Sequence, residues 1–249
     1  MHQFLAQARF ETMRSLRNRR LLLFSWALPI AYYFLLVNIE GSGDTRIGGV
    51  PLKVYYLISM AAFSAIGSAM NGTASRIAFE RTQGWLKLLR TTPLSGRHYV
   101  VGKAASQLVI AAGSVAVVYL CGYFGESVRL PASVWILSFL WILVGTLPFI
   151  ALGMWIGMVS GTNAAQSVSS GLYLVMSLMG GLWSPMQLMP LWLQRIGKAM
   201  PTYRMAEVAW SIVAKTIPHL GDILVTLAYF LAFAVLAAWT FGREQRTSS

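Results

Sequence analysis

Six long apolar stretches, separated by shorter polar segments, follow one another along the chain. A helix that rises about 1.5 Å per residue needs about 20 apolar residues to cross a hydrocarbon core of about 30 Å. The pattern therefore predicts an all-α integral membrane protein with six transmembrane helices, at residues 21–39, 54–73, 99–124, 134–159, 164–183 and 223–241. The fourth stretch contains Pro148 and is long enough to tilt or kink.

Two further segments have a helical period but lie outside these stretches. In residues 1–20, Phe4, Leu5, Ala8, Thr12 and Leu16 share one helical face, with Arg14, Arg17 and Gln7 roughly opposite. This segment is either an amphipathic helix in the headgroup layer or a plain basic flank that anchors the first span. In residues 184–221, Met205, Val208, Ala209, Ile212 and Val213 recur at helical spacing between four prolines, which predicts short re-entrant or interfacial helices.

Composition and charge agree with a membrane protein. Hydrophobic residues make up 56% of the 249 residues and charged residues 11%, while the formal net charge is +12. The low polar content excludes a soluble globule, and with it a nucleic-acid partner for the basic charge. Thirteen Lys and Arg residues lie in the N-terminal segment, the connection between spans two and three with Lys103 counted in it, and the C-terminal tail, against seven elsewhere, which predicts that both termini are cytoplasmic. Four cations after span five do not fit this rule: Arg195, Lys198, Arg204 and Lys215.

The residue types needed for catalysis or ion coupling are sparse. Cys121 is the single cysteine and the three histidines are isolated, so the sequence predicts no metal site. No Asp, Glu, Lys or Arg lies in the middle of a predicted span, which argues against a carrier driven by protons or sodium. No histidine at membrane depth accompanies the serines, so we do not expect an enzyme.

The connection between spans two and three, residues 74–98, carries the most specific pattern. A charged helix continues out of span two, breaks near Gly84, resumes as a short helix with Leu86, Leu88 and Leu89 on an apolar edge, and stops at Pro93. An exposed amphipathic turn held between two spans is well placed to contact a soluble partner. A plain basic loop is the alternative.

This connection resembles the corresponding segment of the type-2 ABC exporter permeases. The resemblance rests on the run from Glu80 to Ser95, followed by Tyr99, Gly102 and Lys103, and the layout of the whole chain is similar to that family. It implies that this segment docks on a separate cytoplasmic ATP-binding subunit through Glu80, Arg81, Gly84, Leu88, Thr92 and Pro93. It also implies that residues 1–20 form a connecting helix beside it.

The resemblance further implies a function and an assembly. The chain would be a permease subunit of an exporter in a bacterial cytoplasmic membrane, paired with a second copy or a close paralogue, moving a drug, antibiotic, lipid or similar amphipathic substrate outward. The sequence lacks the phosphate-binding pattern GxxxxGK[ST], so ATP and magnesium would be bound by the partner and this chain would hold no cofactor. A membrane anchor or an immunity or regulatory component that transports nothing is the alternative.

Polar residues line one narrow face of span two and one of span five. Either they border a substrate path at the interface of two permease subunits, or they pack the helices together. We expect packing for the serines and weigh both roles equally for Asn71, Gln166 and Tyr173. Gly153 and Gly157, four residues apart in span four, also predict close helix packing.

Overall fold

The computed structural model is a bundle of long helices, and it describes residues 19–39, 45–84 and 96–247. Residues 1–18, the greater part of the predicted connecting helix, lie outside this description. The elements are α2 (Arg19–Ile39), β1 (Arg46–Ile47), β2 (Val50–Pro51), α3 (Leu52–Thr82), α5 (Gly96–Gly125), α6 (Ala132–Gly145), α7 (Leu147–Val159), α8 (Thr162–Met179), the 3₁₀ turn η1 (Met186–Leu188), α9 (Leu191–Ala199), α10 (Pro201–Val213) and α11 (Leu220–Thr247).

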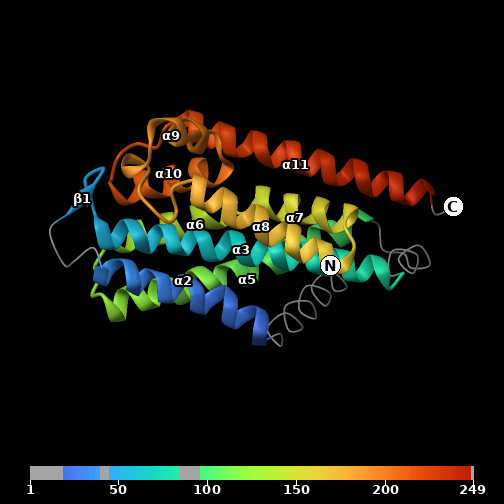
Figure 1. Ribbon diagram of the computed structural model, residues 1–249, viewed down its shortest axis with the longest axis horizontal. Helices are drawn as coiled ribbons and strands as arrows, with labels where there is room; N and C mark the ends of the chain where they lie inside the picture. The colour runs from blue at the N-terminus through green and yellow to red at the C-terminus, as the bar shows by residue number, and fades with distance from the viewer. Residues whose placement is uncertain (1–18, 40–44, 85–95, 248–249) are drawn as a thin grey trace.

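Helix α3 is the centre of the bundle. It contacts α2, α5, α6, α7, α8 and α10, and nearly all of its apolar section is buried. Figure 1 shows α2 and α5 on one side of α3 and α7 and α8 on the other, with α11 outermost. We call the end of the bundle where α3 finishes the Glu80 end, and the end with β1 and β2 the hairpin end.

Four helical stretches in the described ranges are long and apolar enough to cross a membrane. They are Leu52–Thr82, Tyr99–Gly125, Ala132–Val159 and Leu220–Arg243, which correspond to predicted spans two, three, four and six. The described apolar section of α2, Trp26–Ile39, is shorter, and α8 does not meet the same criterion. The membrane-protein class is therefore supported, while the count of six spans stays a prediction.

Helix α8 ends four residues earlier than the predicted fifth span. Gly181 has φ +78°, a conformation that disfavours residues with a Cβ, and it reverses the chain after Met179. The Leu182 N–H donates to the Ser177 carbonyl and the Gly181 N–H to the Leu178 carbonyl, the two bonds of a Schellman cap. The hydrophobic residues Leu182 and Trp183 extended the apolar pattern past this glycine, which is why the sequence placed the end too late.

The helix of predicted span four, expected to tilt or kink, is interrupted near Pro148. Helices α6 and α7 meet at Thr146, and Pro148 occupies the first turn of α7, where its missing N–H removes no helical bond. Gly153 and Gly157 of α7 lie directly on the backbone of α3: a Cβ on either would stand 2.6 Å from a carbonyl oxygen, of Met70 and Ala74 respectively. The spacing of these glycines therefore predicted the close packing correctly.

The segment after α8 folds as short helices over the hairpin end. The residues that repeat at helical spacing in α10 face inward, with Met205, Val208, Ala209 and Val213 buried. The hydrogen bonds that attach this segment to the long helices include those from Trp210 Nε1 to Ser59 Oγ at 3.1 Å and from Trp141 Nε1 to the Met205 carbonyl at 2.8 Å. Figure 1 shows α9 and α10 beside β1 at this end of the bundle.

Candidate functional site

The predicted coupling segment begins where α3 ends. The helix extends beyond its apolar section as far as Thr82, and Gly84, with φ +70°, donates its N–H to the Arg81 carbonyl at 3.1 Å. A glycine with positive φ just after the last turn is a common helix terminator. Glu80 and Arg81 therefore lie on the last turn of α3, with Gly84 just beyond the end of the helix. Leu88, Thr92 and Pro93 lie outside the described residues.

Glu80 fastens the end of α3 to the start of α5. Its Oε1 lies 2.5 Å from Lys103 Nζ, and its Oε2 accepts a hydrogen bond from the Tyr99 hydroxyl. Tyr99 and Lys103 are four residues apart on α5, so both side chains point from the same face of that helix. We call these three residues the Glu80 clasp.

The clasp is shielded from solvent. The Lys103 side chain is 0% exposed and that of Glu80 is 15% exposed. Moving charges out of water is costly, and the loss of one partner of such a pair typically destabilises by about 3–5 kcal/mol because the other charge stays behind. The clasp is thus a strict geometric link between α3 and α5.

The sequence did not predict the partner of Glu80. The sequence places Lys103 among the basic residues near the connection, and the family resemblance implies a docking role for Glu80. The available signal was the spacing of Tyr99 and Lys103, which places a phenol and an ammonium on one face at the entrance of span three. That Glu80 turns inward toward this face depends on how α3 packs against α5.

A second set of polar residues joins α3 to α8. Ser169 and Ser170 of α8 donate to Asn71 Oδ1 at 2.6 and 3.2 Å, and Gln166 Nε2 donates to Ser170 Oγ at 3.0 Å. Ser75 Oγ donates to Gln166 Oε1. We call Asn71, Ser75, Gln166, Ser169 and Ser170 the α3–α8 seam, which brings the two predicted polar faces together within one chain.

Tyr173 continues this contact toward the hairpin end. The residue is 8% exposed, and its ring stacks on Phe63 with 4.6 Å between ring centroids. Its hydroxyl donates to the Phe63 carbonyl at 2.9 Å. Of the three candidate path residues, Tyr173 is thus the most completely engaged in packing, whereas Asn71 and Gln166 are partly exposed.

The described residues hold no group of three or more His, Cys, Asp or Glu side chains that is able to bind a metal ion. What they do show is long apolar helices, a polar seam between α3 and α8, and a shielded ion pair at the end of α3. These are the features of a multi-pass membrane protein.

The chain belongs to the ABC-2 type transporter family, whose model matches residues 2–214. It is 35% identical to the putative transport permease YvfS of Bacillus subtilis, over 94% of this chain and 95% of that protein. It is 26% identical to the probable multidrug ABC transporter permease YbhR of Escherichia coli, over 66% of this chain and 44% of that protein. The family is one of transport permeases, which agrees with the expectation that the chain is not an enzyme.

Proposed function

We propose that this chain is the membrane subunit of an ATP-driven exporter that moves drugs, antibiotics, lipids or similar amphipathic compounds out of a bacterial cell. Membership of the ABC-2 family supports a transporter that works with an ATP-binding subunit, and YbhR, named as a multidrug permease, is the basis for the substrate class. ATP and magnesium are bound by that separate subunit. A second permease chain, a copy or a close paralogue, completes the assembly.

The observation that carries the coupling role is the Glu80 clasp. Residues 85–95 follow directly from the last turn of α3, and the clasp fixes that turn against α5. A force applied to the docking segment therefore acts on two long helices at once. In this arrangement Glu80 is a positioning residue, while Arg81, Gly84, Leu88, Thr92 and Pro93 form or orient the surface that meets the ATP-binding subunit. Both termini and the Glu80 end then face the cytoplasm.

The α3–α8 seam is the proposed moving contact. Its hydrogen bonds join small polar side chains, which exchange partners at little cost when water enters. Alternating access would separate α8 from α3 at Asn71 and Gln166. Tyr173 packs on Phe63 at the other end of this contact. These three residues would then border the substrate path during transport.

The test is to purify the chain with the ATP-binding subunit encoded beside it and to reconstitute the pair in liposomes. Two quantities are measured: ATP turnover and the ATP-dependent movement of a fluorescent amphipathic dye. Glu80→Gln and Lys103→Met are compared with Glu126→Gln, which removes a carboxylate at the hairpin end. The double variant E80Q/K103M is the folding control. It also lacks the ion pair, but no buried charge is left without a partner in it.

We expect the single clasp variants to bind the ATP-binding subunit yet lose ATP turnover and dye movement roughly tenfold, about 1.4 kcal/mol of coupling. Glu126→Gln should leave both unchanged. Full turnover in folded Glu80→Gln would disprove the coupling role. Association with the ATP-binding subunit without movement of any substrate, in the unmodified protein, would favour the membrane anchor or immunity component instead.

A further inference from the structure

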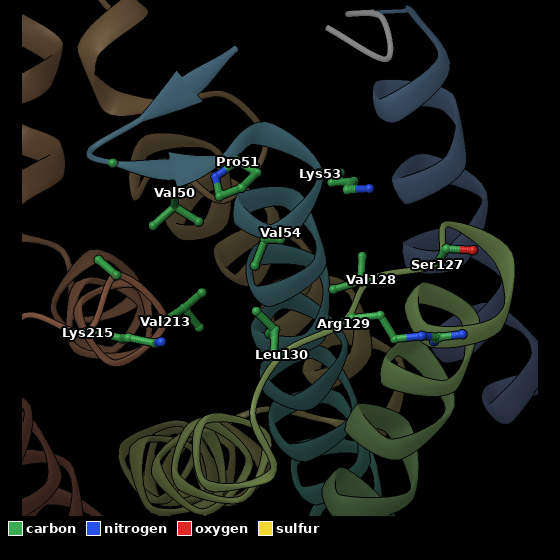
Figure 2. A pocket seen from close by; sticks show the side chains of 12 residues that line it. Val50, Pro51, Lys53, Val54, Ser127, Val128, Arg129, Leu130, Val213 and Lys215 are labelled. Carbon is green, nitrogen blue, oxygen red and sulfur yellow. The ribbon is translucent and has the colours of Figure 1, made fainter. Parts of the chain in front are cut away.

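A cavity of about 450 Å³ opens at the hairpin end of the bundle. Three segments that are distant in sequence surround it: the β2 strand with the start of α3, the connection between α5 and α6, and the residues that follow α10. Figure 2 shows Lys215 and Val213 on one side of the cavity and Lys53, Ser127 and Arg129 on the other. We call it the cation pocket.

Each of the three segments contributes one cation. Lys53, Arg129 and Lys215 belong to the twelve lining residues, and these twelve, all in the described part of the chain, include no Asp or Glu. Like charges gathered around one concavity repel each other, and the low-dielectric walls strengthen the field inside it. An anion in the pocket would remove this repulsion.

The three cations are available to a ligand to different degrees. Arg129 is anchored at the rim: Nη1 donates to the Tyr123 carbonyl at 2.8 Å and the guanidinium stacks on the Tyr123 ring at 3.8 Å, which leaves further N–H donors. Among the described residues, Lys53 Nζ makes one long contact, of 3.5 Å, with the Glu126 carbonyl. The hydrogen bonds and ion pairs among described residues leave the Lys215 ammonium without a partner.

The backbone holds Lys215 in place. Its φ of +57° is uncommon for a residue with a side chain, and the next residue, Thr216, donates its N–H to the Ser211 carbonyl at 3.0 Å. Ser127, on the opposite side, has a similar φ of +50°. Two such turns therefore lie at the rim of one pocket.

The rest of the lining is apolar. Val50, Pro51 and Val54 lie on the side of the hairpin and α3, Val128 and Leu130 on the connection, and Val213 and Ala214 at the end of α10. Phosphate esters match cations of this type because their oxygens accept several charge-assisted hydrogen bonds. An apolar floor beneath a cationic rim suits a phosphate carried on an apolar group rather than a bare ion.

We propose that the cation pocket binds a phosphate ester, either the head group of an anionic membrane phospholipid or a soluble phosphate compound. This role is independent of the proposed export function. It also gives a reason for Lys215, one of the four cations after span five that break the charge rule of the sequence. Arg204, another of the four, is paired with Asp222.

The test uses the purified full chain in a neutral detergent and follows thermal unfolding by tryptophan fluorescence. Dioleoylphosphatidylglycerol, glycerol 3-phosphate and dioleoylglycerol are titrated separately, which gives a phosphate on a lipid, a phosphate alone and a lipid without phosphate. The pocket variant is K53Q/K215Q. The matched control is R195Q/K198Q, which loses the same charge from exposed positions of α9 outside the pocket.

We expect phosphatidylglycerol to raise the unfolding midpoint of the unmodified chain and of the α9 control at similar concentrations. The pocket variant should need roughly tenfold more of it, about 1.4 kcal/mol of binding free energy, because two exposed charged donors to the phosphate are lost. A response to glycerol 3-phosphate as well would identify a soluble ester as a sufficient ligand; a response to the lipid alone would identify the membrane as the source. Equal responses of the pocket variant and the control, or a response to dioleoylglycerol alone, would overturn the assignment.

Discussion

Gly67 of α3 lies directly beneath the ring of Tyr173 of α8. A Cβ at position 67 would stand 2.6 Å from Tyr173 Cζ and 2.7 Å from its hydroxyl oxygen. The same ring is held from the other direction by stacking on Phe63 and by the hydrogen bond to the Phe63 carbonyl. The absence of a side chain at Gly67 thus determines how closely α8 approaches the central helix.

Replacing Gly67 with alanine should therefore destabilise the protein. The added methyl group displaces a ring that is packed on two sides, with an expected loss of about 1–3 kcal/mol. Tyr173→Phe removes only the hydroxyl, so we expect a smaller loss of about 1 kcal/mol. Thermal unfolding midpoints in detergent measure both, and a larger effect of Tyr173→Phe than of Gly67→Ala would contradict this packing.

Gly157 of α7 and Gly171 of α8 form a matched pair of glycines, one against a helix backbone and one in open space. Gly157→Ala places a methyl group 2.6 Å from the Ala74 carbonyl oxygen, and a helix backbone cannot move aside as a side chain tip can. We expect a loss of about 2–3 kcal/mol and looser packing of α7 on α3. A methyl group at Gly171 of α8 would meet nothing within 4 Å, so Gly171→Ala should be neutral or gain up to about 1 kcal/mol from helix propensity. Equal destabilisation by the two alanines would refute the close contact.

The ion pair between Arg204 and Asp222 holds α10 to the first turn of α11. The Asp222 side chain is 6% exposed, so Arg204→Gln leaves a buried carboxylate without its partner. We expect a loss of about 3 kcal/mol, partly recovered in R204Q/D222N because no buried charge then remains. The double-mutant cycle is measured by unfolding midpoints, with exposed Arg195→Gln as the control. Simple additivity of the two changes would show that the pair is not coupled.

Orientation can be tested by single cysteines at the two ends of the bundle. With Cys121 replaced by serine, a cysteine at Ile217, whose side chain is 92% exposed at the hairpin end, should react with an impermeant maleimide added to intact cells. A cysteine at exposed Asn163, at the Glu80 end, should react only after the membrane is opened. The reverse pattern would invert the predicted topology.

Much of the architecture could be predicted from the order of apolar and polar residues. The pattern located the four long spans and the inward face of α10, because each depends on residues that are near one another in sequence. It overestimated the fifth span because hydropathy does not detect the cap at Gly181. The sequence leaves a path role and a packing role equally open for Asn71, because a polar helix face alone does not show which helix or cavity it faces.

The sequence by itself determined the membrane class, the positions of most helices and the family, because hydrophobic length and local motifs are properties of short segments. Only the tertiary structure decided that Glu80 turns inward to Lys103, that Asn71 meets Ser169, and that Lys53, Arg129 and Lys215 surround one pocket. The physical reason is that each of these contacts joins segments well separated in sequence, so it depends on helix packing and on the partners that shield or neutralise each polar group.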